Sequence, residues 1–162
     1  MSTLTPSGGR SIAWEDVRSK YPMHVQHSVH IRQPIQQVSA ALVASPERWF
    51  PKSVGVHVAG IPVRKRVKVE FGEPAKLSSW AVIPISWTPT FAQKLLPIMN
   101  GKVDVAPVSK DETRLTVSGM YEPPLGKIGE QLDEAMMHNV AEGTVKELAE
   151  AIAQRLEKAI KG

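Results

Sequence analysis

The C-terminal part of the chain constrains the fold most. From Ile128 to Ile160, apolar residues recur at intervals of about three and four, which predicts one long amphipathic helix. At about 1.5 Å per residue this helix would be roughly 50 Å long, whereas a ten-residue strand spans roughly 33 Å. The rest of the chain must therefore supply a long apolar surface for it. The predicted stripe comprises Ile128, Leu132, Met136, Val140, Val145, Leu148, Ile152, Leu156 and Ile160.

The middle of the chain is predicted to supply that surface as a sheet. In residues 23–31 every second residue is apolar except His27, and the residues between them are polar. This alternation predicts a half-buried strand with Val25, His27 and Val29 on its inner side. Short connections of the kind that follow favour antiparallel pairing, because parallel strands need a crossover of about a dozen residues or more. Five further β segments are expected at 54–61, 63–72, 75–87, 100–108 and 112–122.

Two short helices are expected between the first strand and the others. Pro34 suits a first helical position before Ile35 and Val38, and Pro46 can open a second helix that ends before Pro51. The prediction is an α+β domain over residues 21–162, with a curved antiparallel sheet of about six strands wrapped around one long C-terminal helix. Residues 1–20 are expected to be a partly flexible N-terminal arm. Because one helix cannot fill a curved sheet, a cavity is expected between them.

The composition excludes several classes of function. The chain has no cysteine, so disulfides, thiolate metal sites and thiol nucleophiles are excluded. His24, His30 and His57 show no repeated spacing with carboxylates, and we expect neither a metal nor a cofactor. No run of about 18 apolar residues and no signal-peptide pattern occurs, so we expect a cytoplasmic protein without stable membrane insertion.

The net charge of +4 does not by itself indicate a nucleic-acid partner. Lysine and arginine are scattered along the chain, and the one dense basic run, residues 63–68, alternates with valines. That alternation is typical of the solvated face of a strand. We therefore expect no nucleic acid among the partners.

Two stretches carry a family resemblance. Residues 29–38, followed by Ser45-Pro46-Glu47-Arg48-Trp49, resemble the start of START-like, or Bet v 1-like (SRPBCC), domains. Residues 113–115 and 121–133 are similar to the last strand and helix entry of polyketide cyclase/dehydrase and lipid transport-like members. The resemblance covers about residues 23–160. It implies a helix-grip fold with an apolar pocket, and since this fold serves many functions it does not name the ligand.

The expected cavity lining is rich in thioether and aromatic side chains, which suits fatty, isoprenoid or polycyclic ligands. His27 stands in the inner register of its strand, where its imidazole could orient a ligand hydroxyl or carbonyl, or could simply be hydrogen-bonded at a cavity rim. The candidate lining residues are His27, Trp80, Trp87, Phe91, Leu95, Met99, Met120, Met136, Met137, Val140, Gly143 and Thr144.

One further group of side chains has two interpretations. Asp133 and Glu134 precede His138 by five and four residues, a spacing that an acid/base pair on one helix face could use. Carboxylates in the first turns of a helix also stabilise it by complementing the helix dipole. The second interpretation requires no catalytic role.

The sequence thus favours binding or carriage of a hydrophobic small molecule, such as a lipid, an isoprenoid or a polyketide-like compound. The alternative is a polyketide cyclase/dehydratase-type enzyme that acts in the same cavity, with His27 or a nearby arginine or tyrosine polarising a carbonyl. A third possibility is a protein-interaction domain, which would expose a large apolar patch. The identity of the ligand and the oligomeric state are left open.

Overall fold

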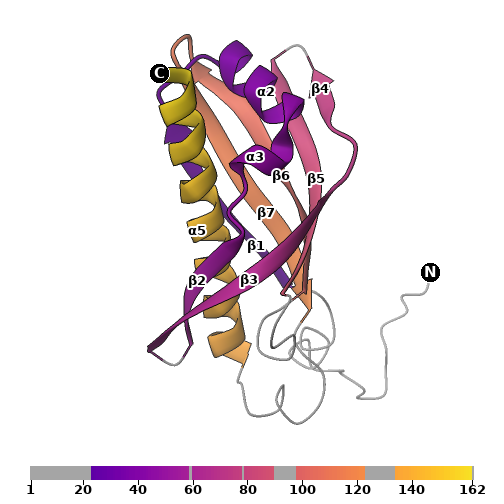
Figure 1. Ribbon diagram of the computed structural model, residues 1–162, viewed down its shortest axis with the longest axis vertical. Coiled ribbons are helices and arrows are strands. Elements are labelled where there is room, and N and C mark those ends of the chain that lie inside the picture. The colour runs from indigo at the N-terminus through magenta and orange to yellow at the C-terminus, as the bar shows by residue number, and fades with distance from the viewer. Residues whose placement is uncertain (1–22, 59, 78, 90–97, 123–133, 162) are drawn as a thin grey trace, which may run out of the picture.

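The computed structural model describes residues 23–58, 60–77, 79–89, 98–122 and 134–161. In this part of the chain an antiparallel sheet curls around one long helix, as predicted (Figure 1). The elements are β1 (Met23–Ile31), α2 (Ile35–Ala44), α3 (Pro46–Trp49), β2 (Ser53–Val58), β3 (Ile61–Phe71), β4 (Ala75–Leu77), β5 (Trp80–Pro89), β6 (Ile98–Ser109), β7 (Glu112–Glu122) and α5 (Glu134–Lys161).

Most element boundaries lie near the predicted ones. The β segment predicted at 75–87 is two strands, β4 and β5, which pair with each other. The last helix is described from Glu134, so residues 128–133 of the predicted helix lie outside the described residues, as does the predicted arm at 1–20. Within the described ranges, no helix is both long and apolar enough to cross a membrane.

The sheet is a path of six antiparallel strands in the order β1-β7-β6-β5-β3-β2, and β4 is added beside β5. Helix α5 packs against β1, β7 and β2, so it contacts both ends of this path. Figure 1 shows α5 along one side of the curled sheet, with α2 near its C-terminal end. The helix therefore bridges two strands that do not pair with each other.

Two glutamates of α5 bind backbone groups at the two edge strands. The Glu147 carboxylate accepts a hydrogen bond of 2.6 Å from the Gly55 N–H of β2 and one of 3.0 Å from the Arg64 guanidinium of β3. One turn from the C-terminus, Glu157 accepts a 3.4 Å bond from the N–H of Arg32, the residue after β1. The N–H groups of Gly55 and Arg32 lie at the two edges of the sheet, where strands lack a neighbour on one side. Their charge-assisted bonds to the two carboxylates help to hold α5 in place.

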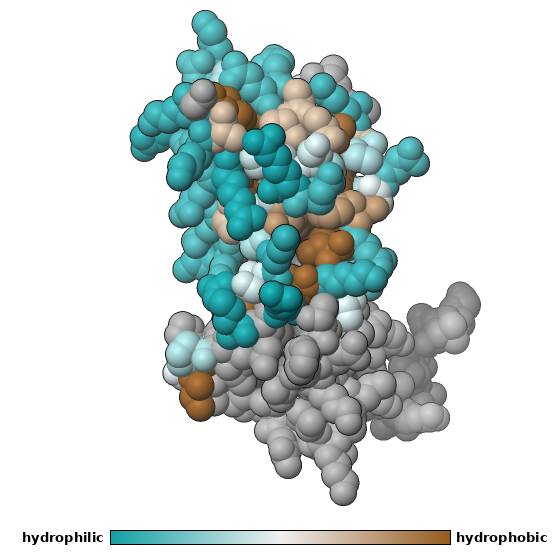
Figure 2. Space-filling model, in the orientation of Figure 1, coloured by the Kyte–Doolittle hydropathy of each residue, from teal (hydrophilic) through white to brown (hydrophobic). Residues whose placement is uncertain are grey.

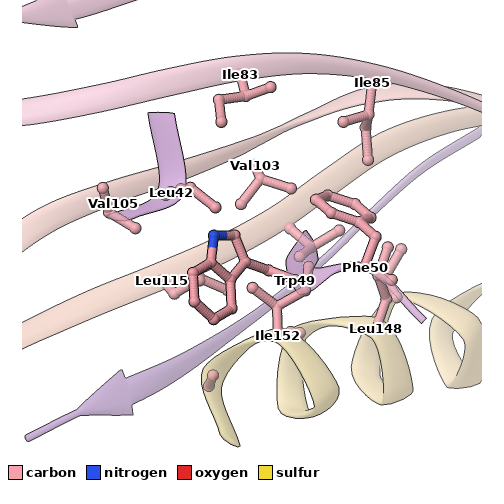
Figure 3. Close-up of a cluster of buried hydrophobic side chains, with 14 of the residues drawn as sticks. Leu42, Trp49, Phe50, Ile83, Ile85, Val103, Val105, Leu115, Leu148 and Ile152 are labelled. Atoms are coloured by element: carbon pink, nitrogen blue, oxygen red, sulfur yellow. The ribbon is translucent and has the colours of Figure 1, made fainter. Parts of the chain in front are cut away.

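One end of the space between sheet and helix is filled by side chains. Trp49 donates its indole N–H to the Ala41 carbonyl at 2.9 Å, and the Phe50 ring meets Phe71 edge-to-face at 4.8 Å. Side chains from α2, the sheet and α5 surround Trp49 and Phe50 (Figure 3). This packed cluster contains Leu42, Trp49, Phe50, Ile83, Ile85, Val103, Val105, Leu115, Leu148 and Ile152.

Two glycines face each other at a close approach of β6 and β7. Gly101 pairs with Gly119 in the register of the two strands. A Cβ added to Gly101 would overlap the Ser118 carbonyl oxygen and lie 2.6 Å from the Gly119 Cα. Only a residue without a side chain fits here, and such positions allow a sheet to bend sharply.

This contact predicts a difference between two glycine substitutions. Gly101→Ala should lower the free energy of unfolding by about 2 kcal/mol or more, because backbone atoms must move to admit the methyl group. Gly143→Ala, in α5, should raise it by up to about 1 kcal/mol, because alanine favours helix and nothing lies within 4 Å of the new Cβ. Urea unfolding of both variants measures the difference, and equal stabilities would contradict the close approach.

Candidate functional site

A row of large side chains crosses the inner face of the sheet at the end where β5 and β7 finish. In the strand register Trp87 pairs with Met99, and Met99 pairs with Tyr121. All three are buried, as expected for positions in phase with the core-facing residues of their strands. An indole, a thioether and a phenol therefore form one continuous wall here.

The next row of the inner face lacks side chains at its centre. Gly101 and Gly119 occupy it, between the buried residues Val25 and Ile85 on the flanking strands. A Cβ on Gly119 would lie 3.0 Å from the Met99 Cγ, so the thioether of Met99 lies close over this position. The sheet thus has little side-chain volume beside the wall of Trp87, Met99 and Tyr121.

A chain of polar groups runs from this wall to the surface. The Tyr121 hydroxyl lies 3.2 Å from His138 Nδ1, and His138 Nε2 lies 2.9 Å from the Glu142 carboxylate. The Tyr121 residue is 1% exposed, whereas the side chains of His138 and Glu142 are 35% and 56% exposed. These hydrogen-bonded groups therefore connect the buried Tyr121 phenol with solvent through the His138 imidazole.

The carboxylate determines how this imidazole can bond. Because an ionised carboxylate only accepts, the proton between His138 and Glu142 sits on Nε2. In the neutral ring, Nδ1 then accepts the hydroxyl proton of Tyr121.

The described residues offer no evident metal site. No three His, Asp or Glu side chains come together in this part of the chain as they do around a metal ion. The one resolved pKa shift is remote from the wall: burial raises the pKa of Asp104, on β6, and the charges of Lys102 and Arg114 partly oppose the rise.

Several of the predicted lining residues lie on the inner side. His27 is half-buried, pairs with Val117 and has the inward phase of β1. Trp87, Met99 and Val140 are buried. Thr144 is also buried, and its hydroxyl donates to the Val140 carbonyl at 2.6 Å.

Two predicted lining residues lie on the other side of the sheet. Trp80 and Met120 are 41% and 42% exposed, and each is out of phase with the buried residues of its strand. Since side chains alternate between the faces of a strand, these two do not line the inner space. The place of a Cβ at Gly143 is open, with no atom within 4 Å.

Four other predicted lining residues cannot be placed. Phe91 and Leu95 lie outside the described residues, and of Met136 and Met137 only the backbone, in α5, is described.

The sequence analysis did not single out Tyr121 or Glu142. The alternation of β7 offered a signal for Tyr121, because Tyr121 lies on the same face of the strand as Leu115 and Val117. For His138 the analysis considered the preceding acids, Asp133 and Glu134, whereas the observed partner is Glu142, four residues further on. A residue four positions before His138 and a residue four positions after it both lie on the same helix face as His138.

Comparison with known proteins identifies the fold. No protein-family model matches the chain, and no curated protein sequence matches it. The crystal structure of the Zhui aromatase/cyclase from Streptomyces sp. R1128 matches with a TM-score of 0.50 and 12% identity, over 86% of this chain and 96% of that one. A conserved protein from Geobacillus kaustophilus gives 0.54 and 13%, over 85% and 97%.

A third structure extends the comparison. Ara h 8.0201 matches with a TM-score of 0.50 and 13% identity, over 85% of this chain and 99% of its own. These similarities span nearly the whole length of each neighbour. The chain has the START-like, or Bet v 1-like, helix-grip fold.

Proposed function

We propose that this protein binds a hydrophobic small molecule between the inner face of the sheet and the N-terminal part of α5. The observation that carries the proposal is the paired glycines Gly101 and Gly119, which add no side chain of their own to the inner face beside buried Trp87 and Met99. Binding sites for small molecules are typically concave and apolar, with a few polar groups. This part of the sheet has that composition.

The two ends of the inner space differ in how they are filled. At the end near α2, Trp49 and Phe50 occupy the space between sheet and helix (Figure 3). At the end near Tyr121, the facing positions Gly101 and Gly119 contribute no side chain, and the Met99 side chain lies over Gly119. A ligand therefore belongs at the Tyr121 end, in contact with Trp87, Met99 and His27.

Tyr121 gives this site one polar group. Its hydroxyl donates to His138 Nδ1, and the proposed polar contact is a hydrogen bond from a ligand hydroxyl to this phenol oxygen. The ligand class that fits is an apolar body with a single hydroxyl, as in isoprenoid alcohols and in hydroxyl-bearing lipids and polyketide-like compounds.

The first prediction uses farnesol as the probe and tryptophan fluorescence as the readout. Farnesol should change the emission of the protein, because Trp87 lies in the wall and an apolar ligand alters its surroundings. The Trp87→Phe variant should lose most of this change, whereas the Trp80→Phe variant should keep it, because Trp80 faces solvent on the other side of the sheet.

A thermal shift provides an independent check of uptake. At a hundredfold excess of ligand over Kd, binding to the folded state alone stabilises by about 2.7 kcal/mol. For a domain of this size that corresponds to a rise in Tm of roughly 5–10 °C. If farnesol changes neither Tm nor emission, and native mass spectrometry of fresh protein shows no bound apolar compound, the proposed function is wrong.

The second prediction separates the polar contact from the apolar one. Tyr121→Phe should weaken binding of farnesol by roughly threefold to tenfold, the value of one hydrogen bond. It should leave binding of the hydrocarbon farnesene unchanged, because the ring and its packing remain. Calorimetric titration of both ligands measures the two affinities, and equal losses for both would show that Tyr121 acts only through packing.

The polar chain favours a second candidate function, a dehydration of the cyclase/dehydratase type in the same space. When the Tyr121 proton turns from His138 Nδ1 to the ligand, Tyr121 can polarise a ligand carbonyl, while His138 and Glu142 connect the hydroxyl with solvent for proton exchange. One structural neighbour is described as an aromatase/cyclase, although at 12% identity. In such a reaction a β-hydroxyketone loses water to give a conjugated enone.

The third prediction tests this candidate with an alkyl β-hydroxyketone, whose enone product absorbs in the ultraviolet. If the protein is a dehydratase, it should form the enone, and Tyr121→Phe should lower the rate at least tenfold with little effect on binding. His27→Ala tests the alternative residue, since it too has the inward phase. A protein that binds the ketone without forming enone is a binding protein only.

A further inference from the structure

We propose that a second site, a groove between α3 and α5, binds a small organic anion with an apolar body, either a phosphate ester or a carboxylate. The groove has a volume of about 620 Å³ and opens on the outer surface. Binding sites for small molecules typically have about 300–1,000 Å³. The proposal does not depend on the function proposed above.

Three of the residues that line the groove are apolar, and we call them its floor. They are Phe50 and Pro51, between α3 and β2, and Ala151 of α5. Glu147, Ala151 and Arg155 follow at intervals of four residues, so they lie on one stripe of the helix. The small side chain of Ala151 between two long ones leaves room for a ligand body.

The rim is mainly cationic. Four basic side chains line the groove, and one of them, Arg64, is paired with Glu147. The other three, Arg48, Lys52 and Arg155, have no carboxylate within ion-pair distance in the part of the chain that the structure describes. Figure 2 shows mostly hydrophilic side chains over the face where α3, β2 and α5 meet.

Two of these arginines are held in position by one residue. Arg48 stacks over the Trp49 ring, with its guanidinium carbon 4.9 Å from the ring centroid. Arg155 donates to the Trp49 carbonyl at 3.4 Å. Each guanidinium has five N–H donors, so both retain donors for an oxyanion.

The acidic residues of the groove do not neutralise it. Glu147 already accepts bonds from the Gly55 N–H and the Arg64 guanidinium, which leaves Glu47 as the other carboxylate. Three unpaired cations thus face one unpaired anion. The groove therefore attracts negative charge, while its floor favours an attached ring or alkyl group.

The test is an NMR titration of the full chain with phenyl phosphate, inorganic phosphate and phenol. Phenyl phosphate should give saturable shifts in the amides of residues 47–53 and 147–155, and it should bind more tightly than either of the other two. Inorganic phosphate lacks the apolar body and phenol lacks the charge. Equal affinity for phenyl phosphate and inorganic phosphate would overturn the role of the floor and with it the proposal.

Matched variants locate the site. Lys52→Gln and Arg155→Gln should each weaken phenyl phosphate binding by about tenfold, the value of a hydrogen bond to a charged group. Lys158→Gln removes the same charge from an exposed position of α5 outside the groove and should have little effect. Ala151→Leu changes no charge and should weaken binding by filling the floor.

Three further results would overturn the proposal. One is an absence of saturable shifts in residues 47–53 and 147–155. Another is a loss with Lys158→Gln equal to that with Lys52→Gln, because binding would then follow net charge alone. The third is a set of shifts centred on Trp87 and Tyr121, because the probe would then occupy the inner space instead.

Discussion

The structure depends on one helix that must cover both ends of a sheet that does not close. The path of strands begins at β1 and ends at β2, and only α5 contacts both among the described elements. An uncovered edge strand exposes N–H groups that invite pairing with other chains. Glu147 and Glu157 bind such groups at the two ends, ten residues apart on the helix. The curved sheet can therefore be covered at both edges only by a helix long enough to reach β1 and β2.

That constraint creates the inner space, and the side chains decide how it is used. Near α2, Trp49 and Phe50 enter between helix and sheet and make a close-packed core. At the other end the facing glycines Gly101 and Gly119 allow the backbones of β6 and β7 to approach, and the Met99 side chain lies over Gly119. The ligand site proposed above adjoins this end.

The sequence predicted the element order because the relevant signals are local. Alternation identified β1, and the helical stripe identified α5, whose members Val145, Leu148 and Ile152 are all fully buried. The sequence also contained a local signal for the position of Trp80, but the prediction used only its apolar character. Trp80 and Trp87 are seven residues apart on one strand, so they must face opposite sides.

Other features depend on register and could not be read from the sequence. That Gly101 faces Gly119 follows from how β6 pairs with β7, and many registers were open before the sheet was known. The pairing of Tyr121 with His138 requires the position of α5 over β7. The groove brings together three separated segments of the chain, residues 47–53, Arg64 and 147–155. No pattern within any one segment predicts it.

The faces of α5 separate apolar packing from polar contacts. Its centre is an uncharged apolar stripe that packs in the core. On one flank, His138 contacts the Tyr121 hydroxyl and the Glu142 carboxylate. On another, Glu147 and Arg155 border the cationic groove, with alanine between them. Because a buried charge is costly without a partner, charges are confined to the flanks. The ligand proposed for the inner face is therefore apolar with one polar atom, whereas the anion proposed for the groove would meet side chains whose charges water already solvates.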